Sequence, residues 1–566
     1  MTPSSSIPSS ATAARWRPAL PGRGWSVTVF ILVVVVSLPV LAVTANLLRP
    51  AGEIWTHLVE TVLLTYVLNS IWLMLGVGLA VAIGGVGTAW LVTMCRFPFS
   101  RSLEWALLLP MAMPAYVVAY TYTGLLDYAG PVQSLLRAAF GWNSAREYWF
   151  PDIRSLGGAI GVMAMVLYPY VYMLARAAFL EQSVCVLEAS RTLGCRPWRA
   201  FLQVALPLAR PAVAAGVALA LMETLNDFGT VHYFAVDTFT TGIYRTWLGM
   251  GEPAAAAQLG AVLMMFVLAL VLAERLSRGS RRFHHTTGRY RRLPRLRLRP
   301  VAAATALLFC LIPILLGFVI PAGVLALWTA EGGFALLSPG GDFLALARNS
   351  MVLAMVTGLV AVAVALLLVY AQRLHPRPLV RGGVRLASLG YAIPGSVIAV
   401  GTLVPLTAVD RVLADFAQNR LGWSIGLLLT GSIVGLVYAY VVRFLGVAVG
   451  GVEASLNKVT PSMEAAARTL GEGSLGTLRR VHLPIIRGSL LSAGLLVFVD
   501  VMKELPATLI MRPFNFDTLA TRTFTLASDE RLAEAGAPAL AIVLVGLLPV
   551  VLLSRTIARS RPGGGQ

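Results

Sequence analysis

Four acidic residues lie inside apolar stretches of the sequence, where a charged side chain is expensive. Glu223 and Asp227 are four residues apart in one stretch, and Asp500 and Glu504 repeat that spacing in another. An ionisable group at membrane depth costs at least about 2.5–3.5 kcal/mol, so it usually faces the interior of a bundle or a water-filled path. If both stretches are helical, each pair shares one helix face. The four carboxylates are therefore candidates for a translocation path that favours a cation.

A structural interpretation of these acids stays open beside the functional one. The carboxylates could form ion pairs with Arg245, Arg522 or Lys503, or lie near the outer water interface. Three tyrosines of an earlier apolar stretch could line the same path, although aromatic residues in such stretches usually serve packing: Tyr116, Tyr120 and Tyr122.

The sequence predicts no catalytic, cofactor or metal site. No Ser/His/Asp, Cys/His or metal-ligand constellation falls at a common depth, and no group of Tyr, His and carboxylates has ligand spacing. The chain has two lysines, Lys458 and Lys503, and neither follows a glycine. A P-loop needs Gly-Lys to hold the phosphates of ATP, so this chain is not expected to be an ATPase or another enzyme.

The composition is that of a polytopic helical membrane protein. Hydrophobic residues make up 57% and charged residues 13%, with a mean hydropathy of +0.77. A membrane-spanning helix needs about 20 mostly apolar residues. Twelve predicted spans follow: 25–48, 64–92, 104–126, 157–180, 211–233, 257–274, 302–328, 348–371, 386–408, 424–447, 489–511 and 537–555. The predicted fold class is all-α, with the lipid bilayer as its environment.

The positive charge predicts topology rather than nucleic-acid binding. The net charge is +19, and ten arginines crowd the stretch 275–299. When spans are numbered from a cytoplasmic N-terminus, these arginines and those flanking other spans fall on the cytoplasmic side. Both termini are therefore predicted to be cytoplasmic, with an even number of spans, and no nucleic-acid partner is expected.

The chain reads as a duplication with an offset of 277 residues. At that offset Glu223 pairs with Asp500, Asp227 with Glu504, and Arg245 with Arg522. The predicted domains are a cytoplasmic tail 1–24, a first six-span repeat 25–274, an Arg-rich linker 275–300, a second repeat 301–556 and a tail 557–566. Six is even, so the halves enter the membrane in the same orientation, with a central path between them.

One polar sequence motif occurs in both halves, in loops 185–210 and 461–487. "EASRTLG" (188–194) is matched by "AAARTLG" (465–471), and Leu-Pro follows thirteen residues later in each copy. Each loop is expected to form a helix that ends at a glycine with positive φ, then a second short helix that Leu-Pro ends at the next span. Such helices could lie in the headgroup layer or dock into a groove of a cytoplasmic partner.

These loops resemble the EAA loop of the membrane subunits of ATP-binding-cassette importers. The resemblance implies that they couple the chain to an ATPase dimer, which switches the path by rigid-body rocking. Ala465 stands where the motif has glutamate, and Glu464 precedes it. The residues that carry the motif are Glu188, Ala189, Ser190, Gly194, Leu206, Pro207, Glu464, Ala465, Ala466, Gly471, Leu483 and Pro484.

Two further stretches, 223–247 and 500–524, closely resemble fused permeases of ferric iron importers. This resemblance implies a bacterial inner-membrane location, two ATPase subunits and a periplasmic or lipoprotein solute-binding protein. Outer segments for docking of that protein would be 127–156, 230–255, 409–423 and 512–536. Import of thiamine, phosphonate or polyamine on the same scaffold remains an alternative. An ion-coupled secondary transporter, with the intramembrane acids as a proton relay, is the alternative from another class.

Overall fold

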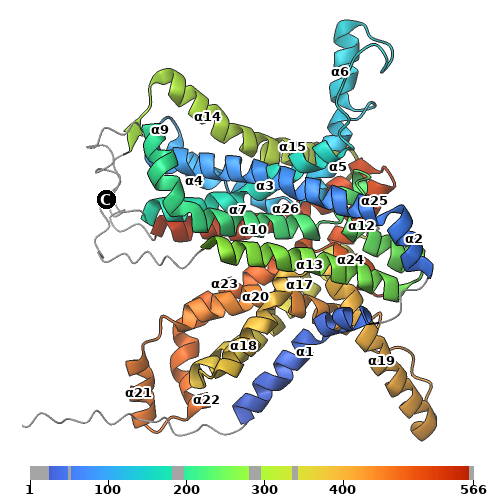
Figure 1. Ribbon diagram of the computed structural model, residues 1–566, viewed down its shortest axis with the longest axis vertical. Helices are drawn as coiled ribbons and strands as arrows, with labels where there is room; N and C mark the ends of the chain where they lie inside the picture. Colours follow the sequence, from blue (N-terminus) through green and yellow to red (C-terminus); the bar gives the residue numbers. More distant parts are fainter. Residues whose placement is uncertain (1–23, 49–52, 182–196, 279–294, 334–341, 560–566) are drawn as a thin grey trace, which may run out of the picture.

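The computed structural model describes residues 24–48, 53–181, 197–278, 295–333 and 342–559, and the predicted all-α membrane fold is confirmed (Figure 1). The two short strands that it describes, β1 (Cys95–Arg96) and β2 (Leu296–Arg297), pair in parallel. The helices of the first half are α1 (Gly24–Asn46), α2 (Glu53–Thr61), α3 (Leu63–Met94), α4 (Ser100–Ala106), η1 (Leu109–Ala112), α5 (Ala115–Leu126), α6 (Pro131–Phe140), α7 (Leu156–Glu181), α9 (Pro197–Ala200), η2 (Phe201–Ala205), α10 (Leu206–Asn226), α11 (Gly229–Tyr233), α12 (Phe239–Tyr244), η3 (Arg245–Gly249) and α13 (Pro253–Arg278).

The second half follows the same order. Its helices are α14 (Pro300–Ile314), η4 (Leu315–Val319), α15 (Ile320–Trp328), η5 (Thr329–Gly333), α17 (Phe343–Leu374), α18 (Pro378–Ala387), η6 (Ser388–Ala392), α19 (Gly395–Leu421), α20 (Ile433–Leu456), α21 (Pro461–Thr469), α22 (Ser474–Thr477), η7 (Leu478–His482), α23 (Leu483–Lys503), α24 (Pro506–Met511), α25 (Leu519–Ser528) and α26 (Leu532–Arg559).

Within the described residues, eleven helices are long and apolar enough to cross a membrane, or twelve if one bent pair counts as a span. The bent pair joins 100–112 to 115–140 with an angle of 89°. The prediction of a single helix over 104–126 was therefore wrong. Pro114 is the reason, because the residue before a proline avoids helical geometry. Met113 accordingly takes an extended conformation, with φ −85° and ψ 126°.

The second half breaks at the equivalent place, and this moves two predicted boundaries. Ile393, which precedes Pro394, is extended with φ −89° and ψ 130°, so the span predicted at 386–408 is α19, which begins at Gly395. The span predicted at 424–447 begins only at Ile433 in α20.

The Leu-Pro pairs do not end the short loop helices as expected. Helix runs without interruption from Trp198 to Asn226 and from Ser474 to Lys503. In each run a π-helical turn, η2 or η7, lies immediately before the Leu-Pro pair. Proline lacks an N–H, and the changed hydrogen-bond pattern of a π turn accommodates that loss without ending the helix.

The repeat has two registers, and the predicted offset holds through α10 and α23 but not through α3 and α17 or beyond α23. The offset of 277 residues relates η2 to η7 and α10 to α23 without error. Beyond them, a capping box at Thr238 matches one at Thr518, which is an offset of 280. Asn69 of α3 and Asn349 of α17, also 280 residues apart, donate to the carbonyls of Asp237 and Asp517. The predicted pairing of Arg245 with Arg522 was therefore wrong, because the second half has three extra residues in the turn before Asp517.

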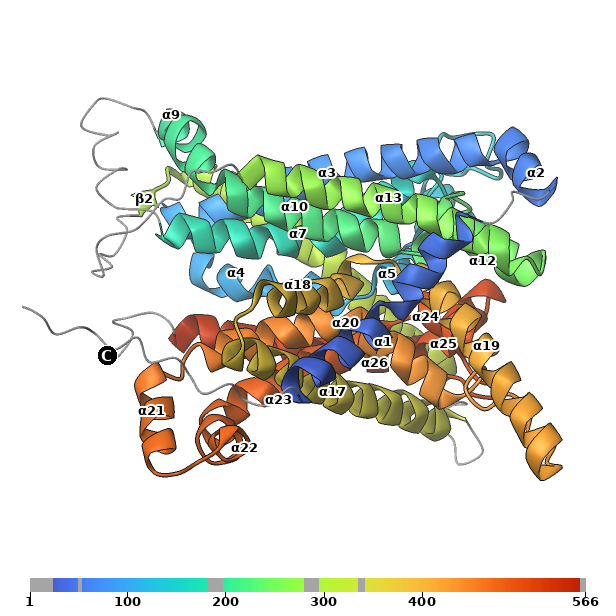
Figure 2. The same ribbon diagram turned by 60° about the horizontal axis from the view of Figure 1, so that its bottom comes forward.

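The first helix of each half packs against the other half. α1 lies on α18, α19, α17 and α13, whereas α14 and α15 lie on α3, α4, α5 and α26. The two views agree that α9, α21 and α22 lie at one end of the bundle (Figures 1 and 2). α2, α12 and the C-terminal part of α19 lie at the other end. The exchanged helices join the halves into a single bundle.

Candidate functional site

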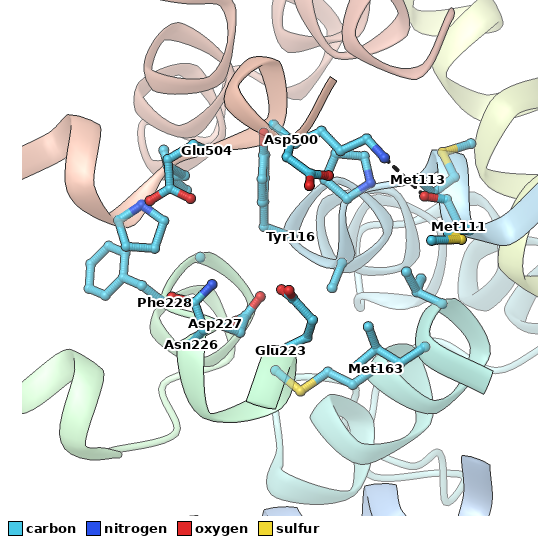
Figure 3. A pocket seen from close by; sticks show the side chains of 18 of the residues that line it. Met111, Met113, Tyr116, Met163, Glu223, Asn226, Asp227, Phe228, Asp500 and Glu504 are labelled. Carbon is cyan, nitrogen blue, oxygen red and sulfur yellow. Dashed lines mark hydrogen bonds between the residues drawn. The ribbon is translucent and has the colours of Figure 1, made fainter. Parts of the chain in front are cut away.

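All four intramembrane carboxylates line one cavity of about 130 Å³ between the halves. Glu223 and Asp227 come from the end of α10, and Asp500 and Glu504 come from the end of α23 (Figure 3). The sequence predicted these residues as one group, and the structure brings them together.

The expectation that the two acids of each pair share a helix face is wrong, because the second acid of each pair lies beyond the end of its helix. α10 ends at Asn226 and α23 ends at Lys503. Asp227 and Glu504 follow in extended conformation, with ψ 132° and 122°. Together with the break before Pro114, three helix interruptions border this cavity, and the break before Pro394 lies within three residues of Tyr391 of its lining. Interrupted helices are tolerated at membrane depth where the freed backbone groups line a cavity or are buried in protein.

Asp227 and Glu504 hold the short helices that follow them. Asp227 accepts hydrogen bonds from the backbone N–H groups of Thr230 and Val231 at 2.9 and 3.2 Å. Glu504 accepts one from Ala507 N at 3.0 Å. A carboxylate in this place satisfies N–H groups that the first helical turn leaves free. These two acids therefore have a structural role at the cavity wall.

Glu223 and Asp500 are less engaged and point into the space between the halves (Figure 3). Glu223 accepts one hydrogen bond, from Tyr391 Oη at 3.3 Å, among the residues that the structure describes. For Asp500 those residues supply no hydrogen bond. These two carboxylates therefore keep acceptor capacity for a ligand in the cavity.

Two basic residues line the same cavity, both from the second half. Arg443 Nη1 pairs with Glu504 Oε1 at 2.9 Å, and both side chains are at most 6% exposed. Lys503 is the other cation. At the repeat offset their counterparts are Val166 and Asn226, which carry no charge. The cavity is therefore asymmetric, and its four carboxylates outnumber its two cations.

The structural interpretation, in which the acids form ion pairs, holds within the described part of the chain for one acid, Glu504, and its partner is not one of the expected residues. Arg245 pairs with Asp237 at 2.9 Å rather than with a cavity acid. The partner of Glu504 is Arg443, which was not among the residues expected from the sequence. The available signal was a single arginine within the apolar sequence "YVVRFLGV", because an ionisable residue inside a span is itself a candidate for function.

Two hydrogen bonds tie the halves together beside the cavity. Asn226 Oδ1 accepts from Gly395 N at 2.7 Å, and Lys503 Nζ donates to the carbonyl of Met111 at 3.0 Å. Asn226 and Lys503 are equivalent positions of the repeat. The last residue of α10 and the last residue of α23 thus each satisfy a backbone group that a proline break has freed in the opposite half.

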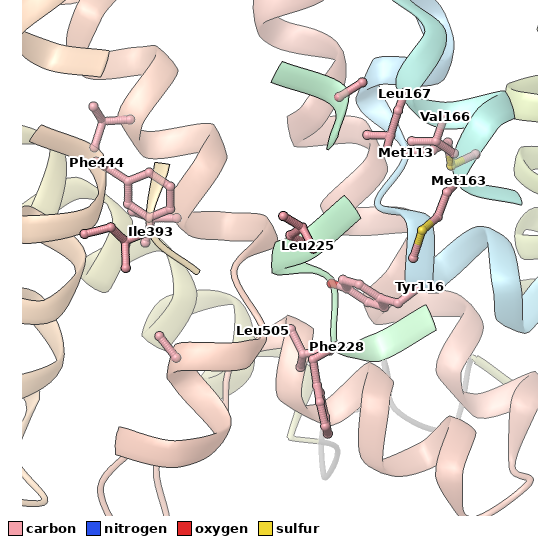
Figure 4. Packing of buried hydrophobic residues seen from close by; sticks show 14 of the residues in the cluster. Met113, Tyr116, Met163, Val166, Leu167, Leu225, Phe228, Ile393, Phe444 and Leu505 are labelled. Carbon is pink, nitrogen blue, oxygen red and sulfur yellow. The ribbon is translucent and has the colours of Figure 1, made fainter. Parts of the chain in front are cut away.

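Apolar side chains form part of the remaining wall around the carboxylates. Met113, Met163 and Val166 approach from the first half, and Phe444 and Leu505 from the second (Figure 4). Burial within the protein strengthens electrostatic interactions inside the cavity, because the local dielectric constant is lower than that of water.

A column of three tyrosines leads from this cavity toward the end of the bundle opposite α21. The rings of Tyr116 and Tyr120 lie 5.8 Å apart, and those of Tyr120 and Tyr233 lie 4.6 Å apart. Tyr116 lines the cavity, while the guanidinium of Arg154 lies 5.2 Å from the Tyr233 ring centroid. We call Tyr116, Tyr120 and Tyr233 the tyrosine column. At Gly229 an added Cβ would lie 2.6 Å from Tyr116 Cβ, so glycine permits the close approach of α11 to α5.

The hydroxyl groups of the tyrosine column have no hydrogen-bond partner among the described residues. Tyr116, Tyr120 and Tyr233 are at most 9% exposed. Leaving a buried hydroxyl unsatisfied costs about 1–3 kcal/mol. Tyr122, the third tyrosine singled out in the sequence, differs, because its hydroxyl donates to the Leu316 carbonyl at 2.7 Å.

The second repeated loop forms the expected helix and glycine turn. α21 is followed by Gly471 with φ +85°, a conformation that favours glycine. Glu464 turns inward, accepting from Arg373 Nε at 2.6 Å and lying 3.2 Å from His482 Nε2. Ala465 and Ala466 are exposed. The inward acid therefore holds α21 against α17 and η7, and small side chains cover the outer face.

The remaining motif residues divide between exposed and hidden positions. Leu206 and Leu483 are half-buried, and Pro207 and Pro484 are exposed. Leu470, beside Gly471, is an exposed apolar residue at 84%. Four motif residues lie outside the described part of the chain: Glu188, Ala189, Ser190 and Gly194.

Two of the four predicted docking segments project from the end opposite α21. α6 and the C-terminal part of α19 extend away from the bundle in different directions (Figure 1). Beside α6, the ring of Trp142 stacks on Phe140 at 4.7 Å and on Tyr148 at 4.8 Å. Trp149 is 86% exposed. This projection presents an aromatic surface to the surroundings.

Comparison with known proteins agrees with this architecture. Residues 82–281 match the family described as binding-protein-dependent transport system inner membrane component. The chain is also 27% identical to the Fe(3+)-transport system permease protein FbpB 2 of Haemophilus influenzae, over 86% of this chain and 89% of that protein. The first half of this permease therefore contains a domain of that family. The family match falls in the first half of the permease, and the second half is related to it by the internal repeat.

Other relatives cover one half of the permease. It is 28% identical to the molybdenum transport system permease protein ModB of Escherichia coli, over 35% of this chain and 86% of that protein. It is 31% identical to the sulfate transport system permease protein CysT of the same species, over 27% of this chain and 51% of that protein. The similarity to FbpB 2 therefore includes the two-half organisation of the permease.

Proposed function

We propose that this permease forms the translocation path of an ATP-driven importer for ferric iron. The observation that carries the proposal is the cavity between the halves, where four carboxylates outnumber two cations. The path favours a cation because cavity walls of low dielectric constant strengthen the attraction of these acids. Glu223 and Asp500 are the residues assigned to contact the cargo, and Asp227 and Glu504 shape the wall.

The charge of the cavity supports iron over the cargo of the shorter relatives. Molybdenum and sulfate permeases are named among the relatives. Molybdate and sulfate are oxyanions, and an excess of carboxylates would repel them. A relative that extends over both halves is named for Fe(3+) transport. Ferric iron is a hard cation that binds oxygen ligands, and a carboxylate-lined cavity suits it.

ATP hydrolysis is assigned to a separate subunit, so the permease itself is not an enzyme. Each repeated loop would dock into one of two ATPase subunits, through the exposed faces of Ala465 and Ala466 in the second copy. Closure of the ATPase pair would then rock the halves about the cavity. The end that carries α21 would face the cytoplasm with both termini, and the opposite end would meet a solute-binding protein outside the inner membrane.

A pair of surface substitutions tests this orientation. Leu470→Asp places a charge on the exposed surface of the second loop and is expected to reduce co-purification of the ATPase at least tenfold. Trp149→Asp, at the other end, is expected to leave the ATPase bound while removing stimulation of ATP hydrolysis by the binding protein. Both side chains are more than four-fifths exposed, so neither change should affect folding. Each variant is the control of the other, and reversed phenotypes would overturn the orientation.

The cargo is tested with the complete transporter in proteoliposomes. ATP turnover is measured with binding protein that is iron-loaded, iron-free or thiamine-loaded, and uptake of radioactive iron is followed in parallel. Stimulation and uptake with the iron-loaded protein are the expected result. Stimulation by thiamine alone would reject iron, and iron uptake driven by a proton gradient without the ATPase would favour a secondary transporter.

A further inference from the structure

We propose that the tyrosine column is a transient binding path for the ferric ion between the outer end and the carboxylate cavity. The inference rests on the proposed function and assigns residues to the outer half of the path. Its ligands would be the phenol oxygens of Tyr116, Tyr120 and Tyr233.

The column connects the two places that a path must join. At the inner end, Tyr116 lines the same cavity as Asp227 and Glu504, and it lies among these acids in Figure 3. At the outer end, Arg154 covers Tyr233 and bridges the halves, with Asp127 at 3.3 Å and Glu530 at 3.8 Å. Glu530 is 78% exposed, so this end of the column reaches the protein surface.

Packing alone does not account for the hydroxyl groups. A phenylalanine would fill the same space, and a buried polar group without a partner is unfavourable. Other buried tyrosines of the bundle are satisfied: Tyr168 Oη donates to Leu107 O at 2.8 Å, and Tyr172 Oη to Glu104 O at 2.7 Å. Within the described residues, the buried tyrosine hydroxyls that lack a partner all belong to the column. Their chemistry therefore points to a ligand.

The phenol group fits a hard trivalent cation. Tyrosine oxygen is an established ligand of ferric iron in proteins, and carboxylate and phenol oxygens are both hard donors. When a ferric ion binds, the phenol loses its proton and the phenolate oxygen forms the new bond, because metal binding displaces protons from its ligands. Asp227, which lines the same cavity as Tyr116, can take that proton and return it when the ion moves on.

Phenylalanine substitutions test the column with its ring packing kept. In the complete transporter with its ATPase and iron-loaded binding protein, Y116F, Y120F and Y233F are expected to lower iron uptake at least fivefold each. The triple variant should abolish uptake while ATP hydrolysis remains stimulated by the binding protein. The matched control is Y122F on the same helix, whose hydroxyl contacts a carbonyl off the column. Y122F is expected to transport iron within twofold of the parent.

A spectroscopic measurement distinguishes failure of the column from failure of the proposed function. Purified permease is titrated with ferric nitrilotriacetate, and the visible charge-transfer band of ferric phenolate is recorded. A band in the parent that is lost in the triple variant supports the inference. The inference is overturned if the triple variant keeps the band of the parent, if the parent shows no band, or if the triple variant transports iron fully. If the parent imports no iron at all, the proposed function itself has failed.

Discussion

Replacing Arg443 with methionine is expected to lower the free energy of unfolding of the permease by about 3–5 kcal/mol. Arg443 and Glu504 form an ion pair with both side chains almost fully buried. Removing the guanidinium leaves the carboxylate of Glu504 charged in an apolar wall, without its cation. Such an uncompensated charge costs more than the pair itself contributes. Unfolding by SDS titration in mixed micelles measures the change.

The charge on Glu504 can be removed as well. In the double variant Arg443→Met, Glu504→Gln, the glutamine still accepts from Ala507 N, and most of the lost stability should return. The matched single control is Arg245→Met. Its ion pair with Asp237 is about half exposed, so a loss within about 1 kcal/mol is expected. Equal losses for Arg443→Met and Arg245→Met would contradict the account of a desolvated pair.

Replacing Glu223 with glutamine is expected to reduce iron uptake at least tenfold while the fold is kept. At an effective dielectric constant of about 20, unit charges about 8 Å apart interact by about 2 kcal/mol, which corresponds to about thirtyfold. The amide keeps the length of the side chain and can still accept from Tyr391 Oη. Uptake of radioactive iron into proteoliposomes, at fixed ATPase and binding protein, is the measurement.

The same substitution separates a cation path from an anion path. If the cavity served an oxyanion, removal of a carboxylate would increase transport of molybdate or sulfate and leave iron unaffected. Glu453→Gln is the control, because Glu453 is an exposed acid of α20 outside the cavity. Uptake that stays at the parental level in Glu223→Gln would exclude Glu223 from the path.

The sequence predicts the helices of this fold well because lipid imposes strong local constraints. Long apolar runs must be helical at membrane depth. The internal repeat can be recognised from the similar polar motifs of the two loops. The interruptions were harder to place. Pro114 ends a helix, whereas Pro207 and Pro484 lie within one, since a π-helical turn precedes each of the latter two. Pro39 and Pro169 also lie within helices, without such a turn, so the presence of a proline alone does not predict where a helix ends.

In the candidate site, too, some residues could be predicted from the local sequence and others could not. The four carboxylates could be predicted from the sequence because acidic residues are rare in apolar stretches and these recur at one offset. Arg443 lies 61 residues from Glu504 in sequence, so their pairing depends on how α20 packs on α23. The tyrosine column could be suspected only as three aromatic residues. Two members belong to the suspected group, but Tyr233 takes the place of Tyr122 because α11 packs against α5.

Fusion of the halves allows a charge distribution that no symmetric pair of identical subunits could have. Each half alone, doubled about a twofold axis, would repeat every one of its residues. Two copies of the first half would surround the cavity with acids and no cation, and two copies of the second would balance each acid with a base. With Arg443 and Lys503 on one side facing Val166 and Asn226 on the other, the single polypeptide holds an intermediate charge. A pore built from two different halves can thus be given a charge between the values that two copies of either half would produce.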